Sequence, residues 1–173
     1  MTTNAGPPTF NKATIAIIMI ILLGITTFIF NGVLDNINNP NKQLTITTNE
    51  FGNKEIILER NRYGHYVASG EINDQPVEFL LDTGATLVAI PEHIAKQLNL
   101  KKGQAFQSQT ANGSSQSYAT TIARLTLGGI VMTNVPASIS SGMEFDEILL
   151  GMSFLKHLHL TQQGKQLRIS VPD

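Results

Sequence analysis

The stretch that decides the fold is Phe79-Leu80-Leu81-Asp82-Thr83-Gly84-Ala85-Thr86. Its apolar start predicts the end of a buried strand, and the residues from Asp82 to Gly84 are typical of a tight turn. Gly84 has no Cβ, so other backbone can approach this turn closely. The strand therefore carries one carboxylate into a turn. Chemistry in which two carboxylates share one proton needs such a residue twice. The sequence supplies it once, which makes the source of a second carboxylate the main question.

Two further stretches accompany this turn. Ser108-Gln109-Thr110-Ala111-Asn112-Gly113-Ser114 predicts a hairpin with a small, polar tip, and Glu147-Ile148-Leu149-Leu150-Gly151-Met152-Ser153-Phe154-Leu155 predicts a buried strand followed by a short helix. In this order and spacing, the three stretches resemble retropepsin-like aspartic proteases, which are single-domain enzymes that work as homodimers. Together with an apolar N-terminal segment, the set is most similar to the bacterial membrane-anchored branch of that family. The resemblance covers about residues 62–171.

The resemblance implies a function and assigns residues to it. It implies an aspartic endopeptidase that cleaves peptide or protein substrates without a cofactor or metal. The catalytic residue is Asp82, one from each chain of a homodimer. The other residues that it assigns are Thr83, Gly84 and Ala85 of the active-site turn, Ala111, Asn112 and Gly113 of a flap over the substrate, and Leu149, Leu150 and Gly151 of a supporting strand. The alternative for Asp82 is an ordinary turn aspartate, and the alternative for the flap is a plain surface hairpin.

The sequence departs from the retroviral members of the family at two places. Retroviral enzymes commonly continue Asp-Thr-Gly-Ala with acidic residues and follow the later glycine with arginine. Here Thr86 and Leu87 follow the turn, and Met152 follows Gly151. The ion pair that braces the retroviral dimer is therefore missing. This leaves a second reading open, that of a catalytically inactive, membrane-tethered module that binds peptides or assists assembly.

The remaining patterns predict a mostly β domain, a closed retropepsin-like β-barrel with one or two short helices. Residues 65–72 and 75–81 flank Asn73-Asp74 as a hairpin, and a further hairpin turns at Gly128-Gly129. Residues 91–98 predict a short helix that begins near Pro91. Residues 165–171 predict a final strand with Leu167, Ile169 and Val171 on one face.

Composition excludes several classes of function. Residues 35–173 contain 11 basic and 13 acidic side chains without a basic stripe, which argues against nucleic acid as a partner. Cysteine is absent, so disulfides, thiol catalysis and Cys-based zinc sites are excluded. His157 and His159 lack a third ligand at metal-binding spacing, and no Gly-x-Ser-x-Gly motif indicates a serine hydrolase.

A membrane segment is predicted from Ala13 to Leu34, a run of 22 residues without a charged side chain. At about 1.5 Å per residue, a helix of this length spans a bilayer core of about 30 Å. A helix that is apolar all round does not fit the core of a soluble protein with a solvent face. A cleaved signal peptide is the main alternative, although the run is long and the following residues lack a small-x-small cleavage site.

Charges beside the segment predict its orientation. Lys12 precedes it and Asp35 follows it, which favours a cytoplasmic N-terminus. We therefore expect a single-pass protein of the inner (cell) membrane whose protease domain faces the periplasm or exterior. The expected division is a cytoplasmic N-terminus at 1–12, a transmembrane anchor at 13–34, a linker or stalk at 35–61 and a protease domain at 62–173. Short strands at residues 44–48 and 55–58 belong either to the stalk or to an edge of the domain.

Overall fold

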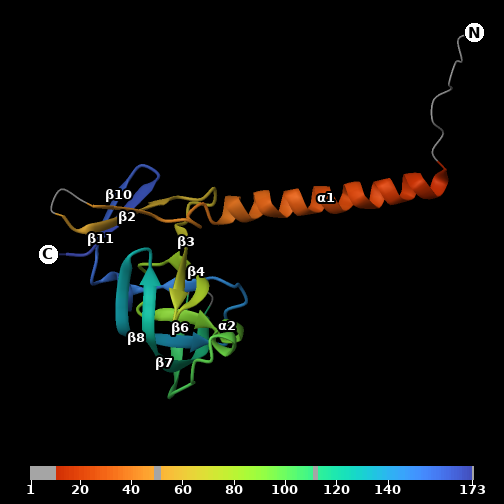
Figure 1. Ribbon diagram of the computed structural model, residues 1–173. Helices are drawn as coiled ribbons and strands as arrows, with labels where there is room; N and C mark the ends of the chain where they lie inside the picture. The colour runs from red at the N-terminus through yellow and green to blue at the C-terminus, as the bar shows by residue number, and fades with distance from the viewer. Residues whose placement is uncertain (1–10, 49–51, 111–112, 173) are drawn as a thin grey trace, which may run out of the picture. The chain divides into compact units, whose positions relative to one another are not determined.

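The computed structural model describes residues 11–48, 52–110 and 113–172 (Figure 1). The chain divides into two compact units, Met1–Asn36 and Ile37–Asp173. The first unit contains helix α1 (Lys12–Asn38), which extends two residues into the second. All other described elements belong to the second unit.

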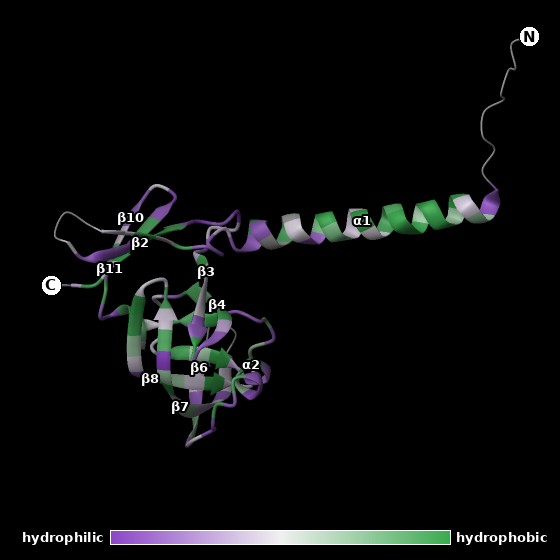
Figure 2. Cartoon of the chain, in the orientation of Figure 1, coloured by the Kyte–Doolittle hydropathy of each residue, from purple (hydrophilic) through white to green (hydrophobic). Residues whose placement is uncertain are grey.

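Helix α1 is long and apolar enough to cross a membrane. At its start, the Asn11 side chain accepts a hydrogen bond from the Thr14 amide at 2.7 Å, as an N-cap residue does. Further along, the hydroxyls of Thr26 and Thr27 donate to the carbonyls of Leu22 and Leu23, so these polar groups are satisfied within the helix. The apolar side chains that dominate the helix (Figure 2) are exposed, and none of its most apolar window is buried within the chain. A membrane anchor and a signal sequence both have these properties.

The second unit contains two sheets of mostly short strands. One is a four-stranded sheet in the order β1-β2-β11-β10, and the other is a seven-stranded sheet in the order β3-β4-β9-β5-β8-β7-β6. The strands are β1 (Thr45–Thr48), β2 (Lys54–Glu59), β3 (Val67–Ile72), β4 (Gln75–Leu81), β5 (Val88–Pro91), β6 (Ala105–Thr110), β7 (Gly113–Leu127), β8 (Ile130–Ser140), β9 (Ile148–Leu150), β10 (His159–Gln163) and β11 (Gln166–Ser170). Two short helices complete the unit, α2 (Glu92–Gln97) and α3 (Met152–Leu155).

The seven-stranded sheet closes on itself. Strand β3 pairs with β4 on one side and with β7 on the other, through Glu71↔Thr126 and Ile72↔Leu125. This joins β3, β4, β9, β5, β8 and β7 into a ring, with β6 added to the edge of β7. The prediction of a mostly β domain with few short helices is confirmed. A ring of strands, an extra edge strand and a separate sheet take the place of the single closed barrel that we expected.

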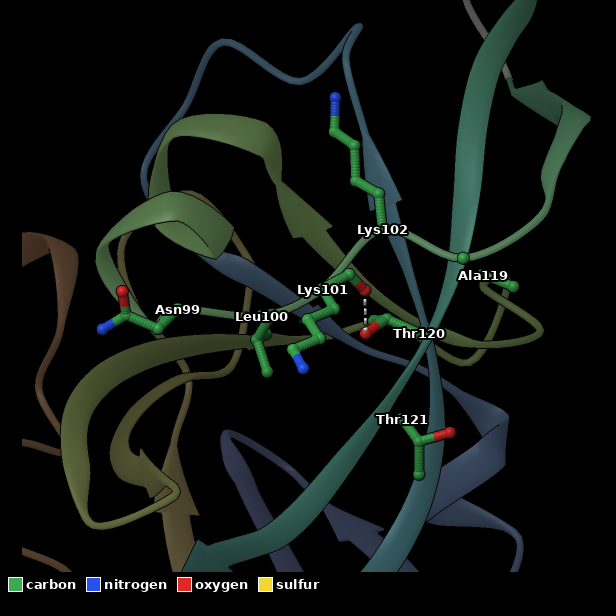
Figure 3. Close-up of a pocket in the computed structure, with 8 residues that line it drawn as sticks. Asn99, Leu100, Lys101, Lys102, Ala119, Thr120 and Thr121 are labelled. Atoms are coloured by element: carbon green, nitrogen blue, oxygen red, sulfur yellow. Dashed lines mark hydrogen bonds between the residues drawn. The ribbon is translucent and has the colours of Figure 1, made fainter.

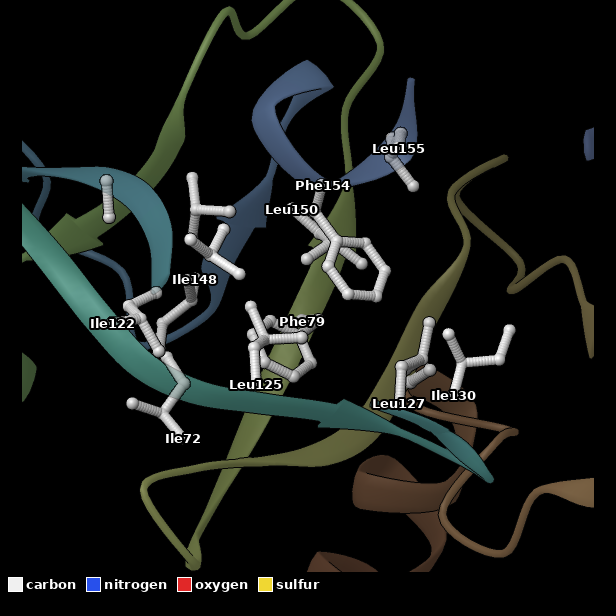
Figure 4. Close-up of a cluster of buried hydrophobic side chains, with 14 of the residues drawn as sticks. Ile72, Phe79, Ile122, Leu125, Leu127, Ile130, Ile148, Leu150, Phe154 and Leu155 are labelled. Atoms are coloured by element: carbon white, nitrogen blue, oxygen red, sulfur yellow. The ribbon is translucent and has the colours of Figure 1, made fainter. Parts of the chain in front are cut away.

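One contiguous core fills the second unit. Apolar side chains from both sheets and from both short helices meet in it, and Figure 4 shows part of this cluster. Its largest fully buried members are Phe79, Phe154, Ile56, Leu58, Ile72, Ile90, Ile122, Leu125, Leu127, Ile139, Ile148 and Leu150. Phe79 and Leu150 lie on the two strands that lead into the Asp82 turn and its support. The core therefore fixes the strands that position the candidate site.

The predicted hairpin turns at Asn73-Asp74 and Gly128-Gly129 agree with the structure. The first hairpin turns at Asn73 and Asp74, which have φ angles of 51° and 64°, a conformation suited to a two-residue hairpin. Gly128 and Gly129 join Leu127 to Ile130 across the next hairpin. Helix α2 begins after Pro91, as predicted. In the last strand Leu167 and Ile169 are buried, whereas Val171 follows the strand and is 40% exposed, so the predicted apolar face is shorter than expected.

The described residues of the predicted stalk after Asn36, 37–48 and 52–61, pack as part of the second unit. Strand β2 pairs with β11 through Leu58↔Leu167 and Ile56↔Ile169, and β1 pairs with β2. Of the two positions open for these strands, the structure places them at an edge of the domain. Through these pairings, the chain before the ring is joined to the C-terminal strands.

Candidate active site

The Asp82 turn begins where β4 leaves the core. The Asp82 amide donates to the Leu150 carbonyl at 3.2 Å, and the Ala85 amide donates to the Asp82 carbonyl at 3.2 Å. The Gly84 amide donates to Asp82 Oδ1 at 2.8 Å, which is the local bond of an aspartate-initiated turn. One carboxylate oxygen is therefore held by the turn itself.

The residues around this carboxylate differ in their exposure to solvent. Asp82 is half-buried, while Thr83 and Gly84 are exposed. The carboxylate thus lies beside a part of the turn that no other segment of the described chain covers. A second molecule can approach it from that side.

Strand β9 supports the turn by pairing with β4, the strand that leads into it. It pairs in parallel with β4 through Leu80↔Leu149 and Leu81↔Leu150. Gly151 then passes so close to the turn that a Cβ there would lie 2.6 Å from the Ala85 carbonyl oxygen and closer still to that of Leu87. Any side chain would collide with backbone at this point. The predicted supporting residues and the predicted turn are therefore brought together.

Helix α3 adds three hydrogen bonds to the same loop. The amides of Met152 and Ser153 donate to the carbonyls of Ala85 (2.8 Å) and Thr86 (2.9 Å). The Val88 amide donates to the Ser153 hydroxyl at 2.9 Å. Sequence reasoning did not single out Ser153. The available signal was its position in the first turn of a short helix directly after Leu149-Leu150-Gly151.

The predicted flap corresponds to the β6–β7 hairpin. Its strands pair from Ala105↔Tyr118 to Thr110↔Gly113, and the hydroxyls of Ser108 and Ser117 lie 2.8 Å apart across it. Ala111 and Asn112, which we assigned to the flap tip, lie outside the described residues. Gly113 begins β7 with a φ of 106°. The structure describes the two strands of this hairpin, and the closure of its tip over Asp82 stays a prediction.

A pocket of about 520 Å³ lies between β7 and the loop before β6 (Figure 3). It is lined by Asn99, Leu100, Lys101, Lys102, Gly103, Ala119, Thr120 and Thr121. The Thr120 hydroxyl closes one side by donating to the Lys101 carbonyl at 2.9 Å. No residue of the Asp82 turn lines this pocket, so we do not assign it to the candidate active site.

Other described aspartates occupy different settings. Asp74 pairs with Arg124 beside the first hairpin turn, and Asp146 lies 2.8 Å from His93 Nε2 on an exposed loop. Within residues 11–48, 52–110 and 113–172, no three or more His, Cys, Asp or Glu side chains gather as metal ligands would. Asp82 is thus the described aspartate that directly follows strand β4, with its buried Phe79, and precedes a glycine-containing turn.

Comparison with known proteins places this geometry in a family. Residues 68–157, more than half of the chain, match the model of the family described as gag-polyprotein putative aspartyl protease. The matched region contains the Asp82 turn, the β6–β7 hairpin, β9 and α3. The match therefore covers every element that contributes to the candidate site.

Two curated relatives are 29% identical to this chain. One is an uncharacterised protein from the cobV 5′ region of a Sinorhizobium species, over 121 residues, and the other is an uncharacterised protein of Rickettsia prowazekii, over 118 residues. The alignments cover 68% and 66% of this chain but 52% and 50% of the relatives. The chain thus spans about half the length of the curated relatives it matches.

A solved structure has the same fold. The crystal structure of a retropepsin-like aspartic protease from Rickettsia conorii superposes with a TM-score of 0.59 and 23% sequence identity. The likeness covers 75% of this chain and 94% of that one. The fold of the described chain is therefore retropepsin-like.

Proposed function

Because the chain belongs to the retropepsin-like aspartyl protease family, we propose that it is a membrane-anchored aspartic endopeptidase that cleaves peptide bonds with Asp82. The observation that carries the proposal is the Asp82 turn itself. Strand β4, which is fixed in the core by the fully buried Phe79, ends at a half-buried carboxylate, and the Gly84 amide orients one of its oxygens at 2.8 Å. Backbone contacts from Leu150, Met152 and Ser153 hold the turn.

The reaction requires a second carboxylate. One ionised carboxylate takes a proton from water, and a protonated partner hydrogen-bonds the carbonyl of the peptide bond to be cleaved. Two carboxylates at this distance do not both ionise, so the pair loses its protons in two separate steps. We propose that the partner is Asp82 of a second copy of this chain. The exposure of Thr83 and Gly84 beside Asp82 supports this arrangement, because a symmetric partner would cover them.

The other site residues have supporting roles in this proposal. Thr83, Gly84 and Ala85 shape the turn, and Leu149, Leu150 and Gly151 back it. The hairpin tip, Ala111, Asn112 and Gly113, closes over an extended peptide, as mobile hairpins do at enzyme clefts.

We further propose that residues 13–34 anchor the chain in the cell membrane and that the protease domain faces the periplasm or exterior. The length and apolar character of α1 support an anchor. Anchoring two copies in one membrane raises their effective concentration, which favours a dimer that lacks the retroviral ion pair. The boundaries at residues 12, 34 and 61 stay predictions.

Cleavage of an unfolded protein by the purified full chain in detergent tests the proposed function. We expect the wild-type chain to cleave it with sensitivity to pepstatin and the Asp82→Asn chain to be inactive with an unchanged melting temperature. Asp74→Asn is the matched control, because it removes a turn carboxylate of the neighbouring hairpin and asparagine tolerates a positive φ. Equal activity of the wild-type and Asp82→Asn chains would contradict the proposal. Peptide binding without cleavage would favour the inactive-module alternative.

A further inference from the structure

We propose that Ser153 is a positioning residue that fixes the end of the active-site loop and so sets where the Asp82 carboxylate lies. The inference rests on the proposed function and extends it to a residue outside the Asp82 turn. Ser153 is 65 residues from Val88 along the chain, yet its hydroxyl accepts a hydrogen bond from the Val88 amide at 2.9 Å. Its side chain is buried, with 8% of the residue exposed.

Ser153 holds the loop at two points. Its own amide donates to the Thr86 carbonyl at 2.9 Å, while its hydroxyl receives the Val88 amide. These two contacts lie on either side of Leu87, whose carbonyl faces Gly151. One residue therefore fixes the path of the chain from Thr86 to Val88.

The start of the loop is fixed in a different way. The Asp82 amide donates to the Leu150 carbonyl, and the adjoining strand pair Leu81↔Leu150 continues that contact. The loop from Asp82 to Val88 is thus attached at its beginning to β9 and at its end to α3. Because β9 and α3 are consecutive, residues 150–153 hold both ends. A shift at the Ser153 end changes the loop that carries the carboxylate.

The hydroxyl has a specific task at this position. Val88 is fully buried, and its amide has no water to replace a lost acceptor. Alanine at position 153 leaves that donor unpaired, so the loop shifts to find another partner. Threonine keeps the oxygen and restores the bond. The two hydrogen bonds of Ser153 also differ from the retroviral ion pair, because every group in them is uncharged.

Kinetics of the full chain in detergent test this role. We expect Ser153→Ala to lower kcat by roughly 10–100-fold, because small misplacements of reacting groups have effects of this size, with little change in KM. Ser153→Thr should recover most of the activity. Ser138→Ala is the matched control, since Ser138 is also a buried serine, and on β8 it pairs with Ala89, which follows the loop.

The pH dependence of kcat separates positioning from loss of stability. Moving one carboxylate relative to the other weakens their coupling, so the two limbs of the profile should move closer together in Ser153→Ala. If the alanine chain does not fold, Ser153→Cys replaces it, because a thiol has a similar shape and is a weak acceptor. A wild-type kcat and profile in the alanine or cysteine chain overturns the inference while leaving the proposed function intact. An inactive wild-type chain overturns both.

Discussion

In the Asp82 turn, a hydrogen bond holds the carboxylate, and the neighbouring residues Thr83 and Gly84 are exposed. Its own loop supplies the Gly84 amide, and its support comes from residues almost 70 positions later in the sequence. Gly151 is the closest point of that support, because the Ala85 and Leu87 carbonyls occupy the space that a side chain would need. The geometry of the candidate site therefore depends on a residue that carries no functional group.

Substitution of Gly151 tests this dependence. We expect Gly151→Ala to reduce the free energy of unfolding by about 1–3 kcal/mol, because the new Cβ forces backbone apart, and to reduce activity as well. Gly129→Ala is the control, since the nearest heavy atoms to its Cβ lie at 3.4 Å, an ordinary contact. Chemical denaturation of the two variants measures their free energies of unfolding. Equal stability of the two chains would show that the close approach has no energetic weight.

The sequence allowed Asp82 and Gly151 to be predicted, and it did not allow Ser153. An apolar strand before an aspartate and a glycine after it form a recognisable local pattern. Ser153 accepts a hydrogen bond from an amide that is remote in sequence, and its position in the first turn of a short helix does not identify that amide. Asn112 and Ala111 stay predictions, as does the catalytic role of Asp82.

Two buried asparagines after α1 attach that segment to neighbouring strands. Asn39 Nδ2 donates to Glu78 Oε1 at 2.8 Å and to Ser69 Oγ at 3.1 Å. The Asn41 side chain donates to the Glu59 and Val67 carbonyls at 2.9 and 2.7 Å, and it accepts from the Glu59 amide at 2.7 Å. These amides join the segment after α1 to β2, β3 and β4.

Asparagine in a sequence typically indicates a turn, and the asparagine-rich run from Asp35 to Lys42 therefore predicts a linker. The local pattern does not reveal that these amides face three strands at once. The pairing of β2 with β11 joins residues more than 100 positions apart, and local alternation carries no information on such partners. Hairpins and α2 were predictable because their signals and their contacts are both local.

Removal of the Asn41 amide tests its role. We expect Asn41→Ala to lower the free energy of unfolding by about 1–3 kcal/mol, because it leaves the buried Val67 carbonyl and the part-buried backbone groups of Glu59 without this partner. Asn38→Ala is the matched control, since Asn38 lies three residues earlier with an exposed side chain. Denaturant titration of the full chain in detergent measures both. A truncated form should begin at or before Ile37, where the compact unit starts. An Asn41→Ala chain as stable as the control would contradict a stabilising role for the Asn41 amide.

At the scale of the whole molecule, one apolar helix precedes one retropepsin-like unit that offers a single Asp82 turn. The helix determines where the unit works, and the single turn determines that it works with a partner. Both statements are proposals, and each has a direct measurement.

The location is tested by a reporter enzyme that is active only outside the cytoplasm, fused after Asp173. We expect reporter activity, because Lys12 before the apolar run favours a cytoplasmic N-terminus. The mass of the mature chain distinguishes an anchor, which keeps residues 13–34, from a cleaved signal sequence. A cytoplasmic reporter, or a mature chain that begins after Leu34, would contradict the anchored arrangement.

The central claim is that two copies of Asp82 form one site, and mixing chains tests it most directly. Wild-type and Asp82→Asn chains are combined under conditions in which subunits exchange, and activity per wild-type chain is measured. Because a mixed dimer has one native carboxylate, an equal mixture should retain about half of this activity, and a threefold excess of the variant about a quarter. The same excess of Asp74→Asn, a chain that keeps Asp82, should leave the activity per Asp82-carrying chain unchanged. Activity per wild-type chain that stays constant at every ratio of Asp82→Asn would contradict a shared site.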